Sequence, residues 1–142
     1  MNEIQFRHET AQDNKLLNIF HLNIRSIRKN FDNFLLLYEQ YDLRTCDVII
    51  LSECFQLENE TYQISGYSTY YDNGDYNRND GIVVLVRSSL VFDVHHIKLE
   101  LSKCTVSRIS LVVSGISFGI TAVYKPPPIS RNTILGRFKD IF

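Results

Sequence analysis

Polar residues that could handle a phosphate ester stand at three points where an apolar run of the chain ends. Asn23 and Ser26 follow the first run, Glu53 follows the second, and Tyr124 and Lys125 follow a late one. A carboxylate oxygen and an amide oxygen are hard ligands of the kind that Mg²⁺ prefers, together with water and substrate phosphate. A Tyr hydroxyl can hydrogen-bond a phosphate oxygen, and a Lys ammonium can offset phosphate charge. These residue types therefore suggest a metal-assisted site for a phosphate ester.

Each of these residues also has an ordinary structural explanation. An Asn after a strand commonly forms an Asx turn, a Glu there is commonly solvated, and a Tyr before Pro commonly packs. His21 falls on the same strand face as Asn23, so it either lines the site or is a hydrogen-bonded structural histidine. His95 and His96 are neighbours on one strand and point to opposite faces, which is poor geometry for a shared metal. None of these residues indicates a functional site by itself, and only the combination of motifs does so.

Two early strands and a helix must position the first two motifs. Residues 16–23 and 46–53 are apolar over most of their length, which is typical of buried strands. Between them, apolar residues recur at helical spacing from Ile27 to Tyr41, and Ser26 is a candidate N-cap. This spacing predicts a βαβ-like start, in which functional groups gather at the carboxyl ends of the strands.

The rest of the chain is expected to form short strands joined by polar loops. Strands are expected at residues 67–71, 81–87, 92–97, 106–113 and 117–124. We expect 81–87 to pair with 92–97 as a hairpin, and 106–113 with 117–124 around a turn at Ser114 and Gly115. Three prolines at 126–128 end the last strand, and a helix is expected at 130–142. Residues 1–14 are polar and expected to be flexible, which leaves one partial domain at residues 15–142.

Composition narrows the function classes. The 142 residues are 44% hydrophobic and 22% charged, which excludes a disordered tail, a collagen-like chain and a charged coiled coil. A formal net charge of −1 does not indicate a strongly basic nucleic-acid binder. Three cysteines without CxxC spacing argue against a disulfide framework and a structural zinc site. No apolar run resembles a signal peptide or a membrane span, so we expect a nuclear or cytoplasmic protein that is not secreted.

Four motifs, taken in order, resemble the endonuclease/exonuclease/phosphatase family, and most closely the apurinic-type endonuclease domain of non-LTR retrotransposons. The resemblance covers about residues 16–142. The motifs are Leu22-Asn23-Ile24-Arg25-Ser26, Asp47-Val48-Ile49-Ile50-Leu51-Ser52-Glu53, Asp80-Gly81-Ile82-Val83-Val84-Leu85-Val86-Arg87 and Val123-Tyr124-Lys125-Pro126-Pro127.

The resemblance implies a four-layered α/β sandwich, with two sheets face to face and helices outside, here truncated before its second half. It implies hydrolysis of a DNA phosphodiester with Mg²⁺, or Mn²⁺, in a parent protein that also carries a downstream reverse transcriptase. It implies no membrane partner and no small organic cofactor. By position, Asn23 and Glu53 would hold the metal, and Tyr124 would contact the scissile phosphate. Substrate phosphate would also meet Lys125, Arg25 and Ser26.

Two catalytic motifs of the family, Gly-Asp-Phe-Asn and Ser-Asp-His, do not occur in the sequence. Gly74-Asp75 matches only by letters, in a polar loop with no apolar strand before it. We therefore expect this chain to be inactive alone. We also expect the inner faces of 82–86 and 109–113 to lack a partner and to be sticky. Two alternatives stay open: a phosphoinositide or sphingolipid phosphoesterase of the same superfamily, and a non-catalytic remnant or binding module that keeps the fold.

Overall fold

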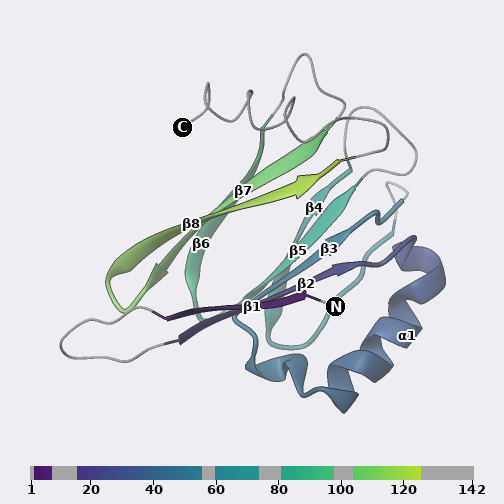
Figure 1. Ribbon diagram of the computed structural model, residues 1–142, viewed down its shortest axis with the longest axis horizontal. Helices are drawn as coiled ribbons and strands as arrows, with labels where there is room; N and C mark the ends of the chain where they lie inside the picture. Colours follow the sequence, from purple (N-terminus) through teal and green to yellow (C-terminus); the bar gives the residue numbers. More distant parts are fainter. Residues whose placement is uncertain (1, 8–15, 56–59, 74–80, 98–103, 126–142) are drawn as a thin grey trace.

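A computed structural model describes residues 2–7, 16–55, 60–73, 81–97 and 104–125 of the chain. The expected helix at 130–142, the three prolines and Gly74-Asp75 lie outside these residues. The elements, in chain order (Figure 1), are β1 (Asn2–Arg7), β2 (Leu16–Asn23), α1 (Ile27–Gln40), the short 3-10 helix η1 (Leu43–Thr45), β3 (Val48–Ser52), β4 (Tyr67–Asp72), β5 (Ile82–Arg87), β6 (Val91–Ile97), β7 (Thr105–Val113) and β8 (Ile116–Tyr124).

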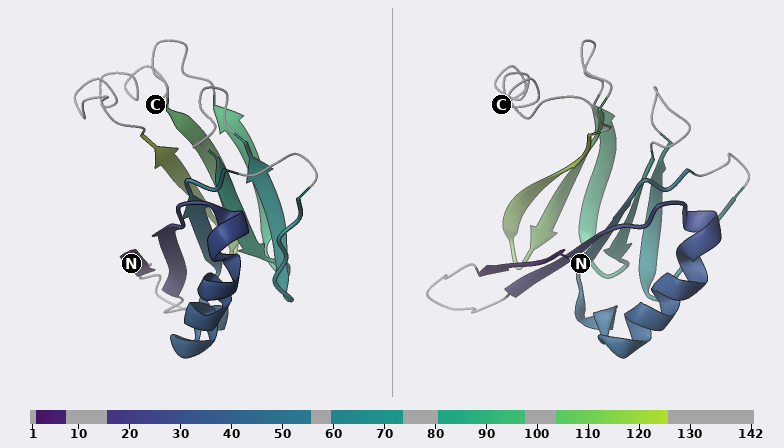
Figure 2. Two further views of the ribbon diagram at one scale, coloured as in Figure 1. Left: turned by 90° about the vertical axis from the view of Figure 1, so that its right-hand side faces the viewer. Right: turned by 45° about the vertical axis from the view of Figure 1, so that its right-hand side comes forward.

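Two sheets lie face to face, and α1 covers the outer face of the larger one (Figure 2). The first sheet has the order β1-β2-β3-β5-β4, and the second has the order β6-β7-β8. Only β2 and β3 pair in parallel among these neighbours, and α1 makes the crossover that a parallel pair requires. The described residues therefore supply helix, sheet and sheet layers of the expected sandwich, and the predicted α/β fold class is confirmed.

Strand β3 lies at the centre of the molecule because both of its faces are covered. All five of its residues are buried. Ile49 and Leu51 pack with the apolar side of α1, including Phe34 and Tyr38. Val48 and Ile50 belong to a second cluster that lies between the two sheets. A strand covered on both faces needs a continuous apolar run, which is the pattern that the sequence has at this point.

The inner faces of the two sheets cover one another, so the expectation that 82–86 and 109–113 lack a partner is wrong. Val84 and Val86 of β5 and Ile109 and Leu111 of β7 are at most 1% exposed and belong to one cluster. The chain builds both sheets itself. After the turn in which the Leu90 N–H donates to the Arg87 carbonyl, at 2.9 Å, it crosses from the first sheet to the second.

Because the chain crosses from the first sheet to the second, one predicted hairpin is wrong, whereas the other is confirmed. β5 pairs with β3 and β4, whereas β6 pairs with β7, so 81–87 and 92–97 do not form a hairpin. The hairpin prediction depends only on residues 81–97, so it takes no account of the two strands, β3 and β4, with which β5 already pairs. β7 and β8 do form the predicted hairpin, and its turn places Ser114 at φ 51° and Gly115 at φ 77°.

The N-terminal segment also departs from expectation. The sequence predicts flexibility over residues 1–14, whereas residues 2–7 form strand β1, which pairs antiparallel with β2 along its whole length. Its sequence alternates Ile4 and Phe6 with polar residues, which is the two-residue period of a strand. Residues 8–14 lie outside the described part of the chain.

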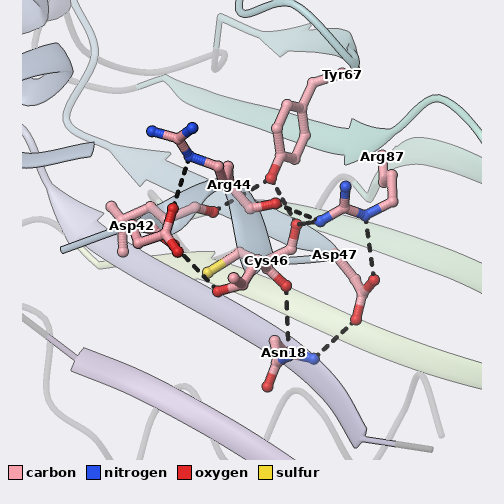
Figure 3. Close-up of polar contacts among 9 residues, drawn as sticks. Asn18, Asp42, Arg44, Cys46, Asp47, Tyr67 and Arg87 are labelled. Atoms are coloured by element: carbon pink, nitrogen blue, oxygen red, sulfur yellow. Dashed lines mark hydrogen bonds and ion pairs between the residues drawn. The ribbon is translucent and has the colours of Figure 1, made fainter. Parts of the chain in front are cut away.

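A polar network holds the start of β3 at the end of the sheet where η1 lies (Figure 3). The Arg87 guanidinium donates to the carbonyls of Arg44 at 2.6 Å and Cys46 at 2.8 Å, and it lies 3.4 Å from an Asp47 oxygen. The Tyr67 hydroxyl donates to the same Cys46 carbonyl at 2.6 Å. The Asn18 N–H donates to Asp47 at 3.0 Å, so the network joins β2, β4 and β5 to the segment that leads into β3.

Candidate metal and phosphate site

The ends of β2 and β3 bring Asn23 and Glu53 together. The parallel register places Asn23 beside Ser52, and Glu53 is the next residue. Beyond the strands, backbone hydrogen bonds continue to join the two loops. Ile24 N–H donates to Ser52 O at 2.9 Å, and Ser26 N–H donates to Glu53 O at 2.7 Å. Both candidate ligands are thus held on one continuous backbone platform, with Asn23 exposed and Glu53 partly exposed.

The platform is built from unusual backbone conformations. Arg25, Ser26, Glu53 and Phe55 have φ values of 50°, 84°, 54° and 51°. Residues other than glycine pay about 1–3 kcal/mol for such conformations, and they gather where a site requires a particular shape. The Asn30 side chain supports the turn by donating to the carbonyls of Ile24 at 2.8 Å and Arg25 at 2.9 Å. Asn30 is a supporting residue that sequence reasoning missed, since a helical Asn carries no distinctive signal.

Asn23 and Ser26 also serve the local structure. The Asn23 Oδ1 accepts the Arg25 N–H at 3.3 Å, which is the Asx turn that the ordinary interpretation predicts. A carbonyl oxygen has two lone pairs, so one remains for a cation. Ser26 occupies the predicted N-cap position, but its side chain makes no capping hydrogen bond, and the residue is buried. Its N–H is already bonded to Glu53 O, so the role of Ser26 toward phosphate stays a prediction.

Tyr124 approaches from the second sheet. It ends β8, is buried, and belongs to the cluster between the sheets. A cavity of about 470 Å³ separates β8 from β2 and β3, and both Ser52 and Val123 line it. Ser52 directly precedes Glu53 in the sequence, and Val123 directly precedes Tyr124. Lys125 follows, partly exposed.

His21 fits the structural interpretation of its sequence position, and its role at the site stays a prediction. It lines the cavity, and its Nε2 lies 3.1 Å from the Ser52 hydroxyl, so it is also a hydrogen-bonded structural histidine. Burial, with a smaller contribution from the positive N-terminus, lowers the pKa of His21 below its usual value. The imidazole is therefore mainly neutral at physiological pH.

The donor set fits a hard divalent cation better than zinc. One carboxylate and one amide oxygen suit Mg²⁺ or Mn²⁺, which keep several waters and add substrate phosphate. Within the described ranges, no cluster of three or more His, Cys, Asp or Glu side chains is placed to hold a metal. Cys54 beside Glu53 is not a candidate ligand. It is buried, its thiol donates to Leu51 O at 3.3 Å, and burial raises its pKa to about 12.

Sequence comparisons do not assign a family: no family model matches the chain, and no curated protein matches it. A solved structure does match, described as the crystal structure of humanized D. rerio TDP2 by 14 mutations. The TM-score is 0.59, the identity is 16%, and the match covers 88% of this chain and 57% of that chain. This chain has the endonuclease/exonuclease/phosphatase fold. It spans a little over half the length of the structure that it matches.

The expected lack of a membrane span can be compared with the helices of the structure. In the described part of the chain, no helix has the length and apolar character that crossing a bilayer requires.

Proposed function

We propose that this protein contributes the metal and phosphate site of a metal-dependent DNA phosphodiesterase, of the nicking type found in non-LTR retrotransposons. The observation that carries the proposal is the shared backbone platform of Asn23 and Glu53 at the ends of two parallel strands. The fold, matched over 88% of the chain, supports the same class. The match between the retrotransposon motifs and the platform residues favours DNA over other phosphate esters, and a reverse transcriptase as the downstream partner.

Each residue has a separate task in this proposal. Glu53 and Asn23 hold Mg²⁺ or Mn²⁺, which when bound offsets charge on the phosphate oxygens. The Tyr124 hydroxyl donates to a nonbridging phosphate oxygen from the opposite sheet. Arg25 is exposed and Lys125 partly exposed, which supports a role for both in attracting the DNA backbone.

The chain alone is expected to bind without cutting. The water-activating Asp and Asn of Gly-Asp-Phe-Asn and the His of Ser-Asp-His do not occur in its sequence. Metal and phosphate binding by the platform requires neither motif, whereas in-line attack by water requires an activating group.

A DNA-binding titration with a matched carboxylate control tests the proposal. Fluorescence anisotropy of a labelled duplex would be measured with Mg²⁺ and with EDTA, for the native chain, Glu53→Gln and Glu39→Gln. Glu39 is a highly exposed carboxylate that forms an ion pair with Arg44. We expect Mg²⁺ to strengthen DNA binding by the native chain and Glu39→Gln but not by Glu53→Gln. An equal effect of Mg²⁺ on all three proteins would overturn the proposal.

A supercoiled-plasmid assay addresses the expected lack of cleavage separately. No nicking is expected from the native chain. Mg²⁺-dependent nicking that is absent from Glu53→Gln would uphold the site and show that the chain is catalytically complete.

A further inference from the structure

Three polar side chains join the two sheets through one carboxylate. Asp72 ends β4 in the first sheet, and its Oδ2 accepts the hydroxyl of Ser107 from β7 at 2.6 Å. The same oxygen lies 2.7 Å from Nδ1 of His96 in β6, which must donate because the carboxylate cannot. We call Asp72, His96 and Ser107 the inter-sheet latch.

The latch lies in surroundings that otherwise favour apolar residues. The Asp72 side chain is 5% exposed and Ser107 is fully buried, while His96 is 27% exposed. Buried apolar residues of both sheets, including Ile82, Val84, Ile109 and Ala122, pack together between the sheets. A buried carboxylate is costly unless hydrogen bonds compensate it, and here two donors do so. Apolar contact alone is non-directional, whereas these two bonds define one relative position of the sheets.

The same three residue types form hydrolytic triads elsewhere, but this arrangement is different. In a triad the Ser hydroxyl donates to the imidazole, and the imidazole donates to the carboxylate. Ser107 donates directly to Asp72 and has no exposed surface, so no substrate can reach it. The latch is therefore a structural link rather than a second reaction centre.

The latch lies at the same end of the sheets as the candidate site. Asp72 is opposite Ile82, Ile82 is opposite Ser52, and Ser52 is beside Asn23, so these residues form one row across the first sheet. In the second sheet, Ser107 is opposite Ala122, two residues before Tyr124. The link thus fixes the spacing of the sheets at the level where Asn23 and Tyr124 lie.

We propose that Asp72 is a positioning residue, which acts through His96 and Ser107 to set the place of Tyr124 relative to Asn23 and Glu53. The functional consequence rests on the proposed phosphodiesterase site. The geometric consequence does not depend on it: without the latch, the second sheet shifts on the first at this end.

The test uses two substitutions of one residue in the full chain. His96→Asn keeps an amide nitrogen where Nδ1 stood, whereas His96→Gln carries its nitrogen one carbon further out. His95→Gln is the control, because the side chain of His95 is 52% exposed. The readout is the set of NMR cross-sheet NOEs between the Tyr124 ring and the methyl groups of Ile82 and Val84, which share its cluster.

We expect the NOEs to be retained in His96→Asn and His95→Gln and lost in His96→Gln. NOEs that are unchanged in a folded His96→Gln variant would overturn the proposal, even if its melting temperature falls. If His96→Gln does not fold, Ser107→Ala replaces it with the same expectations and the same overturning result.

The metal-dependent gain in DNA affinity is measured on the same proteins. We expect the gain to shrink in His96→Gln and to be restored in His96→Asn. If the native chain shows no metal-dependent gain in DNA affinity, the proposed function is wrong. The NOEs then still test whether Asp72 positions Tyr124.

Discussion

At the scale of single residues, the candidate site depends on a few side chains held by an uncommon backbone. The sequence indicates Asn23 and Glu53 as candidates because oxygen-bearing side chains at the ends of apolar strands are visible in it, and their role as ligands stays a prediction. The positive φ values of Arg25, Ser26 and Glu53 could not be predicted, because these residue types do not favour that region. The conformations are imposed by hydrogen bonds between two loops that lie far apart in the sequence.

Removal of two buried hydroxyls on one face of β7 should have different effects on the stability of the protein. Thr105 and Ser107 are both fully buried, but among the described residues Thr105 Oγ1 has no hydrogen-bond partner, whereas Ser107 donates to Asp72. We expect Thr105→Val to leave stability unchanged or raise it by up to about 1 kcal/mol. Ser107→Ala should lower stability by about 1–3 kcal/mol, because Asp72 loses a donor. Urea unfolding of both variants measures this, and a larger loss in Thr105→Val contradicts it.

At the scale of elements, most strands and α1 follow from hydrophobic pattern, but their connections do not. The network around Arg87 and Asp47 fixes how the chain passes from η1 into β3 (Figure 3). Asp47 and Arg87 belong to two of the quoted motifs, but neither motif indicates this network, which Tyr67 and Arg87 reach because β4 and β5 lie beside one another. The sequence therefore predicts the strands but not the hydrogen bonds that hold the strand ends together.

Tyr67 gives this network a predictable alkaline response. Its hydroxyl donates to Cys46 O at 2.6 Å, and burial raises its pKa above the usual value near 10. The folded state therefore keeps this proton longer than the unfolded state. The stability that Tyr67 contributes is full below about pH 10 and is lost as pH rises beyond it.

We expect Tyr67→Phe to lower the free energy of unfolding by about 1 kcal/mol at pH 7. The difference in free energy of unfolding between Tyr67→Phe and the native chain should be smaller at about pH 10.5. The native chain loses stability there because Tyr67 ionises more readily in the unfolded state, whereas Phe has no proton to lose. Denaturant unfolding at the two pH values tests this. A difference that stays constant with pH would show that the Tyr67 hydroxyl is not protected from ionisation.

At the scale of the whole molecule, the order of motifs predicts the correct fold, while the local hairpin signal at 81–97 does not predict the crossing between sheets. Whether two successive strands pair depends on the neighbours that each already has. Since the two inner faces bury one another, the two sheets share one core cluster. The sheets should therefore unfold together.

A single core substitution tests this cooperation. Ile109 of β7 is fully buried between the sheets, whereas Val91 of β6 is 72% exposed. We expect Ile109→Ala to cost about 2–5 kcal/mol and Val91→Ala to change stability by less than about 0.5 kcal/mol. Circular dichroism and tyrosine fluorescence should show one shared transition for each protein. Separate transitions for the two probes in the native chain would mean that the sheets unfold independently.

We propose that the ends of β2 and β3 form a site for a divalent cation. An EPR titration that follows free Mn²⁺ tests it directly, without requiring turnover or DNA. We predict that the native chain and Glu39→Gln bind Mn²⁺ with equal affinity. Glu53→Gln should bind at least about tenfold more weakly, which corresponds to about 1.4 kcal/mol. Equal Mn²⁺ affinity in all three proteins, or no binding by the native chain, would contradict the claim.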